Sequence, residues 1–209
     1  LLEVAIGEIF TGAGMAFAIY GGLTRSAANL LVEFGPDDVR DLMCQKLFAG
    51  EWAGTMLLTE SGAGSDVGSN RTKAKRAEGE LWHLEGEKIF ISSGDQDLSE
   101  NIVHLVLART PGAPDGTKGL SLFLVPKFRF DAEGNLGERN GIFVTGIEEK
   151  MGIHGSATCT LALGADQPCI GRLLGNEFDG IKLMFHMMNE ARIEVGVQGL
   201  SGASASYQF

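Results

Sequence analysis

The stretch that decides the fold is Thr59-Glu60-Ser61-Gly62-Ala63-Gly64-Ser65-Asp66, which directly follows the apolar run Met56-Leu57-Leu58. Its two glycines allow main-chain N–H groups to approach an anion closely and turn toward it. Its hydroxyl groups add further hydrogen-bond donors. We interpret the stretch as a cradle for a phosphorylated cofactor. A tight turn between two strands is the alternative, and for the glycines alone it would be the better explanation.

Two nucleotide-binding motifs with similar glycines do not fit the chain. Gly62–Gly68 is one residue longer than the Rossmann fingerprint, and Ser69–Arg76 is polar and strand-like where that fingerprint requires a helix. A P-loop requires a Gly-Lys-Ser/Thr sequence, which does not follow here. The cradle therefore belongs to another class of fold.

Composition limits the function classes that remain. The net charge of −10 disfavours non-specific binding to nucleic acid or to anionic membranes, which needs a basic surface. The three cysteines are far apart and are expected to be free, buried thiols, and neither they nor the four histidines show metal-ligand spacing. No uninterrupted apolar run reaches the about 18 residues of a membrane-spanning helix. The first residues lack the basic region of a signal peptide.

The chain reads as three regions with different hydrophobic periods. Residues 1–52 are predicted to be the end of an N-terminal helical domain, 53–172 a β-domain, and 173–209 the start of a C-terminal helical domain. The predicted fold class is α+β: a central, mostly antiparallel β-barrel or sandwich flanked by helices of truncated helical domains. Both ends of the chain look cut within a helical pattern.

Within this plan, short apolar or alternating runs predict the strands and Gly-rich or polar runs the connections. A turn is predicted at Glu85-Gly86, a surface loop over Phe130–Asn140, a turn over Gly171–Gly175, and a helix from Asp179. The predicted strands are 55–59, 71–76, 81–84, 87–92, 101–109, 120–125, 141–145 and 158–163.

A second segment, Lys88-Ile89-Phe90-Ile91-Ser92-Ser93-Gly94, places an aromatic ring and hydroxyl groups near the end of a strand. An aromatic ring can pack on a flat heterocycle, and a hydroxyl can bond its edge. A core position for Phe90 is the plainer alternative.

Together, Met56–Asp66 and Glu87–Gly94 closely resemble the two flavin-binding motifs of acyl-CoA dehydrogenases. Lys150–Ser156 resembles a segment late in that family's β-domain. Gly175–Gly180, leading to Asn189-Glu190-Ala191-Arg192, resembles the entry to its C-terminal helical domain. The four motifs occur in the family's order over roughly residues 35–205. The loop near 130–145 is similar to that of the larger bacterial subgroup, whose members carry a C-terminal extension.

The resemblance implies FAD as cofactor and assigns roles by position. Thr59 would bond the flavin ring, and Ser65 would reach the FAD pyrophosphate and lie beside the acyl-CoA. Phe90, where many members have Trp, would pack on the isoalloxazine, and Ser92, where many have Thr, would bond it near N5. Asn189 and Arg192 match positions near the acyl chain, although an interhelical ion pair is an alternative for Arg192. The remaining implied cofactor contacts are Met56, Leu58, Gly64 and Ile91.

The implied reaction is α,β-dehydrogenation of an acyl-CoA thioester to a trans-2-enoyl-CoA. A carboxylate removes the α-proton while the β-hydrogen leaves as hydride to the flavin. An electron-transfer flavoprotein would accept the electrons. The resemblance further implies fatty-acid β-oxidation, a cytoplasmic location and a homo-oligomer for the full-length protein. The net charge and the lack of a long apolar run predict neither nucleic-acid binding nor a membrane span.

One departure from the family concerns the catalytic base. The usual glutamate would lie beyond Phe209, and the alternative position just before the helix arginine is Ala191. Glu190 is one residue away, which turns a helical side chain by about 100°. No catalytic residue is assigned, and the chain alone is predicted to be inactive. Three alternatives stay open: a flavin-dependent oxidase, a DNA-associated member of the superfamily, and a non-catalytic β-domain that serves as an interaction module.

Overall fold

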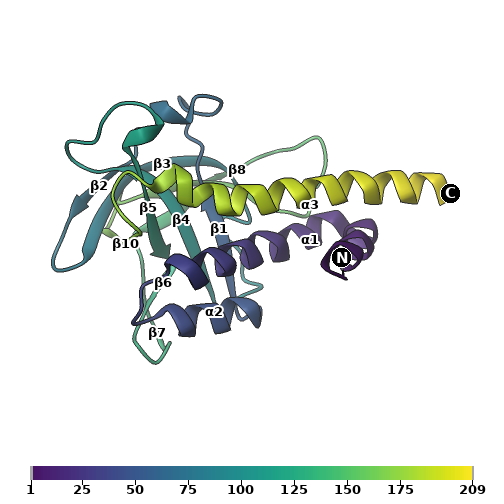
Figure 1. Cartoon of the computed structure of the whole chain (residues 1–209), viewed down its shortest axis with the longest axis horizontal. Coiled ribbons are helices and arrows are strands. Elements are labelled where there is room, and N and C mark those ends of the chain that lie inside the picture. The colour runs from purple at the N-terminus through teal and green to yellow at the C-terminus, as the bar shows by residue number, and fades with distance from the viewer. Residues whose placement is uncertain (1, 209) are drawn as a thin grey trace.

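Residues 2–208 of the computed structural model are described below, without the side chain of residue 3. Two helices, α1 (Leu2–Phe34) and α2 (Arg40–Phe48), precede the strands, and a third helix, α3 (Gly180–Gln208), follows them (Figure 1). The strands are β1 (Trp52–Leu57), β2 (Lys73–Arg76), β3 (Leu81–Ser92), β4 (Asn101–Arg109), β5 (Leu120–Pro126), β6 (Phe128–Phe130), β7 (Leu136–Arg139), β8 (Ile142–Ile147), β9 (Thr158–Leu163) and β10 (Cys169–Leu174). Short 3₁₀ turns lie at Val67–Ser69 and Thr117–Gly119.

The strands form a mixed sheet that closes on itself as a small barrel. Its order is β1-β4-β5-β10-β3-β9-β8, and β2 bridges β3 and β4, which completes a ring of β4, β5, β10, β3 and β2. Among the described strands of this sheet, the β1–β4 and β2–β4 pairings are parallel and the others are antiparallel. The predicted α+β class with a mostly antiparallel barrel is confirmed.

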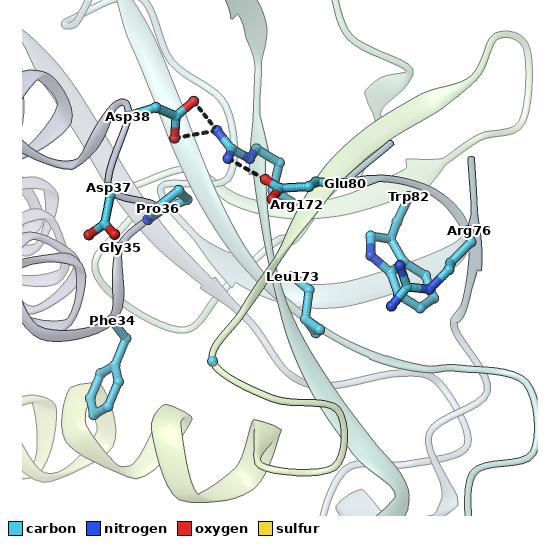
Figure 2. A pocket seen from close by; sticks show the side chains of 11 residues that line it. Phe34, Gly35, Pro36, Asp37, Asp38, Arg76, Glu80, Trp82, Arg172 and Leu173 are labelled. Carbon is cyan, nitrogen blue, oxygen red and sulfur yellow. Dashed lines mark hydrogen bonds and ion pairs between the residues drawn. The ribbon is translucent and has the colours of Figure 1, made fainter. Parts of the chain in front are cut away.

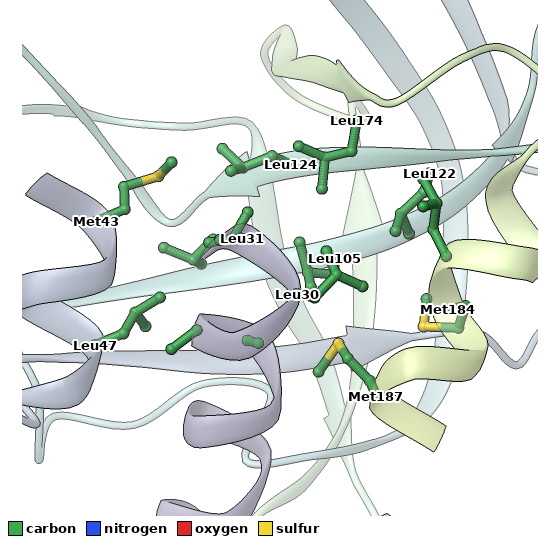
Figure 3. Packing of buried hydrophobic residues seen from close by; sticks show 14 of the residues in the cluster. Leu30, Leu31, Met43, Leu47, Leu105, Leu122, Leu124, Leu174, Met184 and Met187 are labelled. Atoms are coloured by element: carbon green, nitrogen blue, oxygen red, sulfur yellow. The ribbon is translucent and has the colours of Figure 1, made fainter. Parts of the chain in front are cut away.

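Strand β4 shows how alternation divides the apolar residues between two cores. Leu105 and Leu107 face the helices in a first cluster, whereas Val106 and Ala108 face the barrel interior in a second. Figure 3 shows the first cluster, in which Leu105 and Leu30 meet Met184 and Met187 of α3. Full burial of each such side chain contributes about 1.5–3 kcal/mol to folding. The three cysteines are free and buried, as predicted.

Helices α1 and α3 pack side by side and run beyond the barrel together, so that the N- and C-termini lie at the same end of the molecule (Figure 1). Polar contacts join them: Arg25 bonds Glu194 at 3.1 Å and Asn29 bonds Glu190 at 3.0 Å. At the barrel, Gly54 of β1 permits close approach of α1, because a Cβ there would lie 2.5 Å from the Cβ of Ala27.

The N-terminal helix also carries an apolar stretch that meets the length and composition of a membrane-crossing segment. It lies within Val4–Phe34 and has a mean hydropathy of 1.4. Glycines divide it into shorter apolar runs, so it contains no uninterrupted apolar run of about 18 residues, but its average hydropathy stays high. The most apolar part of the stretch is only 6% buried in this structure. The buried residues of the helix, Ala27, Ala28, Leu30 and Leu31, belong to the first core.

Three predicted connections are wrong. Glu85-Gly86 is not a turn: β3 continues through Gly86, which bends at φ 154° as the strand leaves its β2 and β10 partners for β9. Gly171 lies inside β10 opposite Trp82, and the turn begins only at Gly175, with φ 62°. The predicted loop over residues 130–140 contains most of the β6–β7 hairpin. At Gly86 and Gly171 glycine indicated a break where a strand distant in sequence supplies the pairing, whereas over residues 130–140 polar composition concealed a local hairpin.

Candidate functional site

The Thr59–Asp66 stretch begins with a tight turn. Glu60 and Ala63 exchange two main-chain hydrogen bonds, of 3.3 and 3.0 Å, and form an isolated β-bridge. The turn is followed by the short 3₁₀ segment Val67–Ser69 rather than directly by a partner strand. The local geometry is therefore a tight turn, as the alternative predicted. This turn does not directly connect the two strands of a hairpin.

The two glycines of this turn have no explanation within the chain. Neither Gly62 nor Gly64 has a positive φ. A Cβ at Gly62 would meet nothing within 4 Å, and one at Gly64 would only touch Thr59 Cγ2 at 3.8 Å. Residues 61, 62, 64 and 65 are exposed. Glycine is required neither for packing nor for backbone conformation here, which agrees with a surface kept open for the close approach of another molecule.

A buried ion pair joins this turn to the second segment. The ammonium of Lys88 has no solvent exposure; it donates to Glu60 Oε1 at 2.8 Å, to the carbonyl of Leu58 at 3.1 Å, and to Asn70 Oδ1. Next to it, the main-chain N–H of Ile89 donates to the carbonyl of Thr59 at 2.9 Å. These bonds bring Leu58–Glu60 and Lys88–Phe90 together, although about thirty residues separate them in sequence.

The Glu60 carboxylate is satisfied on both oxygens. Oε2 accepts from the N–H of Arg71 at 2.6 Å, while Oε1 accepts from the N–H and hydroxyl of Thr72 at 3.0 and 2.6 Å. Burial opposes its charge, but Lys88 and these donors more than compensate, so that the pKa of Glu60 lies below its usual value. Burial lowers the pKa of Lys88 to about 8, against the opposing effect of Glu60. Both groups are charged at neutral pH.

Directly after Lys88, a β-bulge presents Phe90 to solvent. Lys88 pairs with Leu161 and Ile91 with Cys159, so β3 contains one more residue than β9 between these two pairs. Phe90 has φ 58°, in the left-handed region that non-glycine residues seldom adopt, and its side chain is 58% exposed. A core position for Phe90 is therefore wrong. A strained main chain that holds an apolar ring in water is typical of a binding surface.

The other predicted cofactor contacts surround this ring to different degrees. Ser65 is exposed, and Met56, Leu58, Thr59 and Ser92 are half-buried. Ile91 is 2% exposed and belongs to the barrel core, so that only its main chain is available for contact.

Two buried polar groups near the site have no hydrogen-bond partner among the residues that the structure describes. The hydroxyl of Ser93, the residue after Ser92, has none, and neither does the amide nitrogen of Asn70, whose oxygen accepts from Lys88. Ser93 also has a positive φ of 56°. Unpaired donors of this kind are costly unless another molecule satisfies them.

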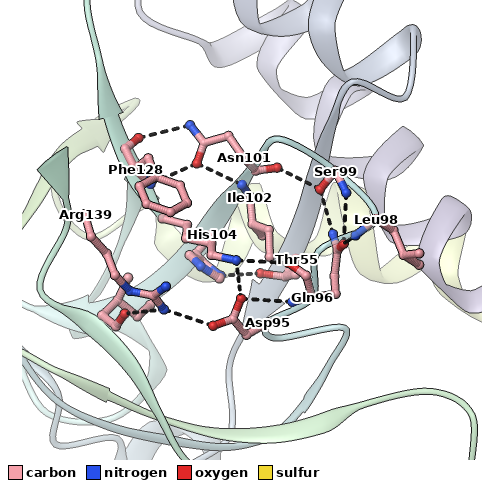
Figure 4. A network of polar contacts seen from close by, with 12 residues as sticks. Thr55, Asp95, Gln96, Leu98, Ser99, Asn101, Ile102, His104, Phe128 and Arg139 are labelled. Carbon is pink, nitrogen blue, oxygen red and sulfur yellow. Dashed lines mark hydrogen bonds and ion pairs between the residues drawn. The ribbon is translucent and has the colours of Figure 1, made fainter. Parts of the chain in front are cut away.

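The segment that follows β3 is held rigidly by ion pairs (Figure 4). Asp95 accepts from Lys127 at 2.5 Å and from Arg139 at 2.9 Å, and these bonds keep its pKa below its usual value despite partial burial. Nearby, the hydroxyl of Thr55 lies 2.7 Å from Nδ1 of the fully buried His104, whose pKa burial lowers to about 3. His104 is therefore neutral at pH 7, and it joins β4 to β1 rather than facing the site.

The predicted acyl-CoA residues lie on a different element. Asn189 and Arg192 are exposed on α3, where Arg192 donates to Asn189 Oδ1 at 3.1 Å and lies over the ring of Phe185 at 5.2 Å. No hydrogen bond or ion pair among the described residues joins either to Thr59–Ser65 or Phe90–Ser92. For Arg192 the structure shows no interhelical ion pair within the described part of the chain; that interaction is made by Arg25 and Glu194.

A cavity of about 750 Å³ lies away from both motifs, between the α1–α2 connection, the β2–β3 hairpin and β10 (Figure 2). Its charged groups are already paired: Arg172 binds Asp38 at 2.8 Å and Glu80 at 2.9 Å. Arg76 lies over the ring of Trp82. No residue of Thr59–Asp66 or Lys88–Gly94 lines this cavity, so we do not assign the cofactor to it.

The sequence reasoning missed Glu60 and Lys88 as functional candidates, although both lie inside the quoted motifs. No signal in the sequence marked Lys88, because it directly follows Glu87, and a lysine at the polar start of an apolar run is ordinarily exposed. The partner of Lys88, Glu60, could not be identified from sequence spacing, because their contact depends on how β3 packs against the Glu60–Ala63 turn.

Comparison with known protein families agrees with this geometry. Residues 55–165, more than half of the chain, match the family model "Acyl-CoA dehydrogenase, middle domain". The chain belongs to the acyl-CoA dehydrogenase family, a family of oxidoreductases, which confirms the resemblance drawn from the sequence.

Individual relatives support the same assignment. The chain is 47% identical over 206 residues to the broad-specificity linear acyl-CoA dehydrogenase FadE5 of Mycobacterium tuberculosis, covering 97% of this chain and 33% of that protein. It is 43% identical over 208 residues to 3-methylmercaptopropionyl-CoA dehydrogenase of Ruegeria pomeroyi, covering 100% of this chain and 35% of that protein. The chain thus spans about a third of the length of these relatives.

A solved structure shares the fold as well. The crystal structure of an acyl-CoA dehydrogenase complexed with FAD from Bacillus anthracis superimposes with a TM-score of 0.76 at 30% identity, over 96% of this chain and 32% of that one.

Proposed function

We propose that this chain forms the flavin-facing wall of an enzyme that uses FAD to dehydrogenate an acyl-CoA thioester at its α,β-carbons. The observation that carries the proposal is Phe90, an apolar ring held in solvent by a strained bulge beside a turn whose glycines have open space around them. Family membership supplies the ligand: the relative from Bacillus anthracis is a complex with FAD.

The residues present fit such a group. Phe90 offers a flat apolar surface, and the unpartnered Ser93 hydroxyl and Asn70 amide mark polar capacity that the chain leaves unused. We propose that Phe90 packs on the isoalloxazine, that Thr59 and Ser92 donate to its edge, and that Ser65 reaches the pyrophosphate. Met56, Leu58 and Gly64 would form the adjoining wall, and Ile91 would contribute through its main chain. Ser65, Asn189 and Arg192 are proposed to lie along the acyl-CoA.

In this scheme the chain's own residues bind, orient and exclude water rather than transfer protons. Bound FAD would supply the acceptor for the hydride that leaves the β-carbon. Donors on fixed strands hold their geometry more closely than donors on mobile loops. We assign no catalytic base to residues 1–209, and Glu190 is already engaged by Asn29.

Several wider features belong to the same proposal. We propose domain boundaries at 52/53 and 172/173, with residues 53–172 as the cofactor-bearing β-domain. An electron-transfer flavoprotein as electron acceptor, a role in β-oxidation, a homo-oligomeric full-length protein and a cytoplasmic location follow from the family. The absence of nucleic-acid binding rests on the net charge of −10.

The test is reconstitution of the natural polypeptide that carries this sequence. We expect a yellow protein with flavin absorbance that acyl-CoA bleaches anaerobically, and a Phe90→Ala variant that binds FAD more weakly with an altered flavin band. Fast reoxidation by oxygen would instead indicate an oxidase, and a colourless protein that binds no FAD would refute the proposal in favour of an interaction module. The 209-residue chain alone is expected to show no turnover.

A further inference from the structure

We infer that Lys88 and Glu60 are positioning residues: their buried ion pair fixes the two flavin-facing segments relative to each other and thereby sets where Phe90 points. The inference rests on the proposed function, because it concerns the same site. It adds two residues to which no direct contact with the cofactor is assigned.

The first argument is where the pair lies. Lys88 is the residue from which the bulge starts, two positions before Phe90 and next to the Ile89–Thr59 main-chain bond of 2.9 Å. Its ammonium reaches the carbonyl of Leu58 at 3.1 Å and the Glu60 carboxylate at 2.8 Å. One side chain therefore cross-links both proposed cofactor segments next to a main-chain bond that also joins them.

The second argument is that the surroundings hold the pair in one arrangement. Glu60 accepts from the main chain at Arg71 and Thr72, and from the Thr72 hydroxyl. Thr72 in turn packs against Gly86, where a Cβ would lie 2.5 Å from its hydroxyl oxygen. Arg109 holds the carbonyl of Asn70 at 2.8 Å. Because each partner is fixed by another bond, the ammonium cannot shift without breaking several contacts.

The third argument is that stability alone is a poor reason for a fully buried ion pair. The cost of desolvating two charges offsets their attraction, so that an apolar pair of similar volume often replaces them without loss. What such a pair does supply is one defined register. Here the pair would fix the register of the strained bulge in β3. That bulge exposes the large side chain of Phe90, which is a proposed cofactor contact.

The experiment compares three variants of the natural polypeptide with wild type: Lys88→Met combined with Glu60→Gln, Thr72→Val, and Ser121→Ala. The double variant removes both charges together. Thr72→Val is nearly isosteric and removes one bond to Glu60. Ser121→Ala is the matched control, because it also deletes a buried hydroxyl, which accepts one bond from the N–H of Phe178 in the connection between β10 and α3.

The first readout is amide hydrogen exchange of the cofactor-free protein. We expect exchange over residues 86–94 to rise about tenfold or more in the double variant, and by a smaller factor in Thr72→Val. Exchange over β4 should stay at the wild-type rate in both variants, and Ser121→Ala should leave residues 86–94 unchanged. Since no cofactor is present, this readout does not depend on whether FAD is the ligand.

The second readout is FAD affinity and the shape of the flavin band in the loaded protein. We expect affinity to fall about tenfold in the double variant, with a shifted band. Wild-type exchange, band and affinity in a folded variant would overturn the inference. If the double variant does not fold, Thr72→Val decides by the same criteria. A wild-type protein that binds no FAD would refute the proposed function instead, while the exchange result would still judge the positioning role.

Discussion

Replacing Phe90 by glycine and by alanine tests the bulge directly, because the two variants lose the same aromatic ring and differ only in how they tolerate the main chain. Phe90 has φ 58°. An L-residue with a Cβ pays about 1–2 kcal/mol in the left-handed region, whereas glycine adopts it freely. Against this stands the greater flexibility of glycine in the unfolded chain, worth about 0.5–1 kcal/mol.

The midpoints of these two ranges leave Phe90→Gly more stable than Phe90→Ala by about 0.75 kcal/mol. For a chain of this size, each kcal/mol of added stability raises the temperature midpoint of unfolding by about 2–4 °C. The assay is thermal or urea unfolding of both variants under identical conditions, in the absence of cofactor.

A matched control lies three positions earlier on the same strand. Glu87 is exposed, pairs with Ala162, and does not have a positive φ. There the order should reverse, with Glu87→Ala more stable than Glu87→Gly by about 0.5–1 kcal/mol. If Phe90→Ala is as stable as Phe90→Gly, or if both positions show the same order, the left-handed bulge is wrong and so is the case for a strained, presented ring.

Three further predictions concern the framework. Leu105→Ala, at a fully buried position in the first core, should lower the free energy of unfolding by about 2–5 kcal/mol, as urea unfolding would show. His104 has a pKa of about 3 when folded, so the unfolded chain binds an extra proton between about pH 3 and 6.5. Stability should therefore fall as pH drops through that window, by up to about 1.4 kcal/mol per pH unit, and His104→Asn should remove this slope. Asp95→Asn should cost about 1–3 kcal/mol at pH 7, because Lys127 and Arg139 lose a charged partner. The pKa of Asp95 is depressed in the folded protein. The stability difference between wild type and Asp95→Asn should therefore shrink as the pH falls below 3.8, the ordinary pKa of this carboxyl group, and Asp95 becomes protonated.

The local sequence pattern was sufficient to predict a strand where the alternation or apolar run of that strand is clear by itself. Asn101–Arg109 and Thr158–Leu163 have the predicted bounds, because each is an apolar or alternating run ended by polar residues or glycine. Pattern was insufficient where pairing overrides composition, as at Gly86 and Gly171, since the partner strands lie far away in sequence. The motif residues themselves were found from the sequence. The ion pair of Lys88 and Glu60 that supports them could not be found, because it forms where β3 meets the turn after β1, and hydrophobic periodicity does not show which segments meet.

The packing of α3 on α1 has a consequence for how this polypeptide folds as it leaves the ribosome. The buried face of α1 ends near Leu31, but the Leu183–Met187 part of α3 that covers it is made about 150 residues later. At about 5–20 residues per second, that face waits roughly 7–30 s for its partner. Met43 and Leu47 of α2 can cover part of that face early, but the part that packs on Met184 and Met187 has no partner until α3 is made. The part of α1 that α3 covers therefore stays exposed to solvent while the barrel is being made, until α3 emerges from the ribosome.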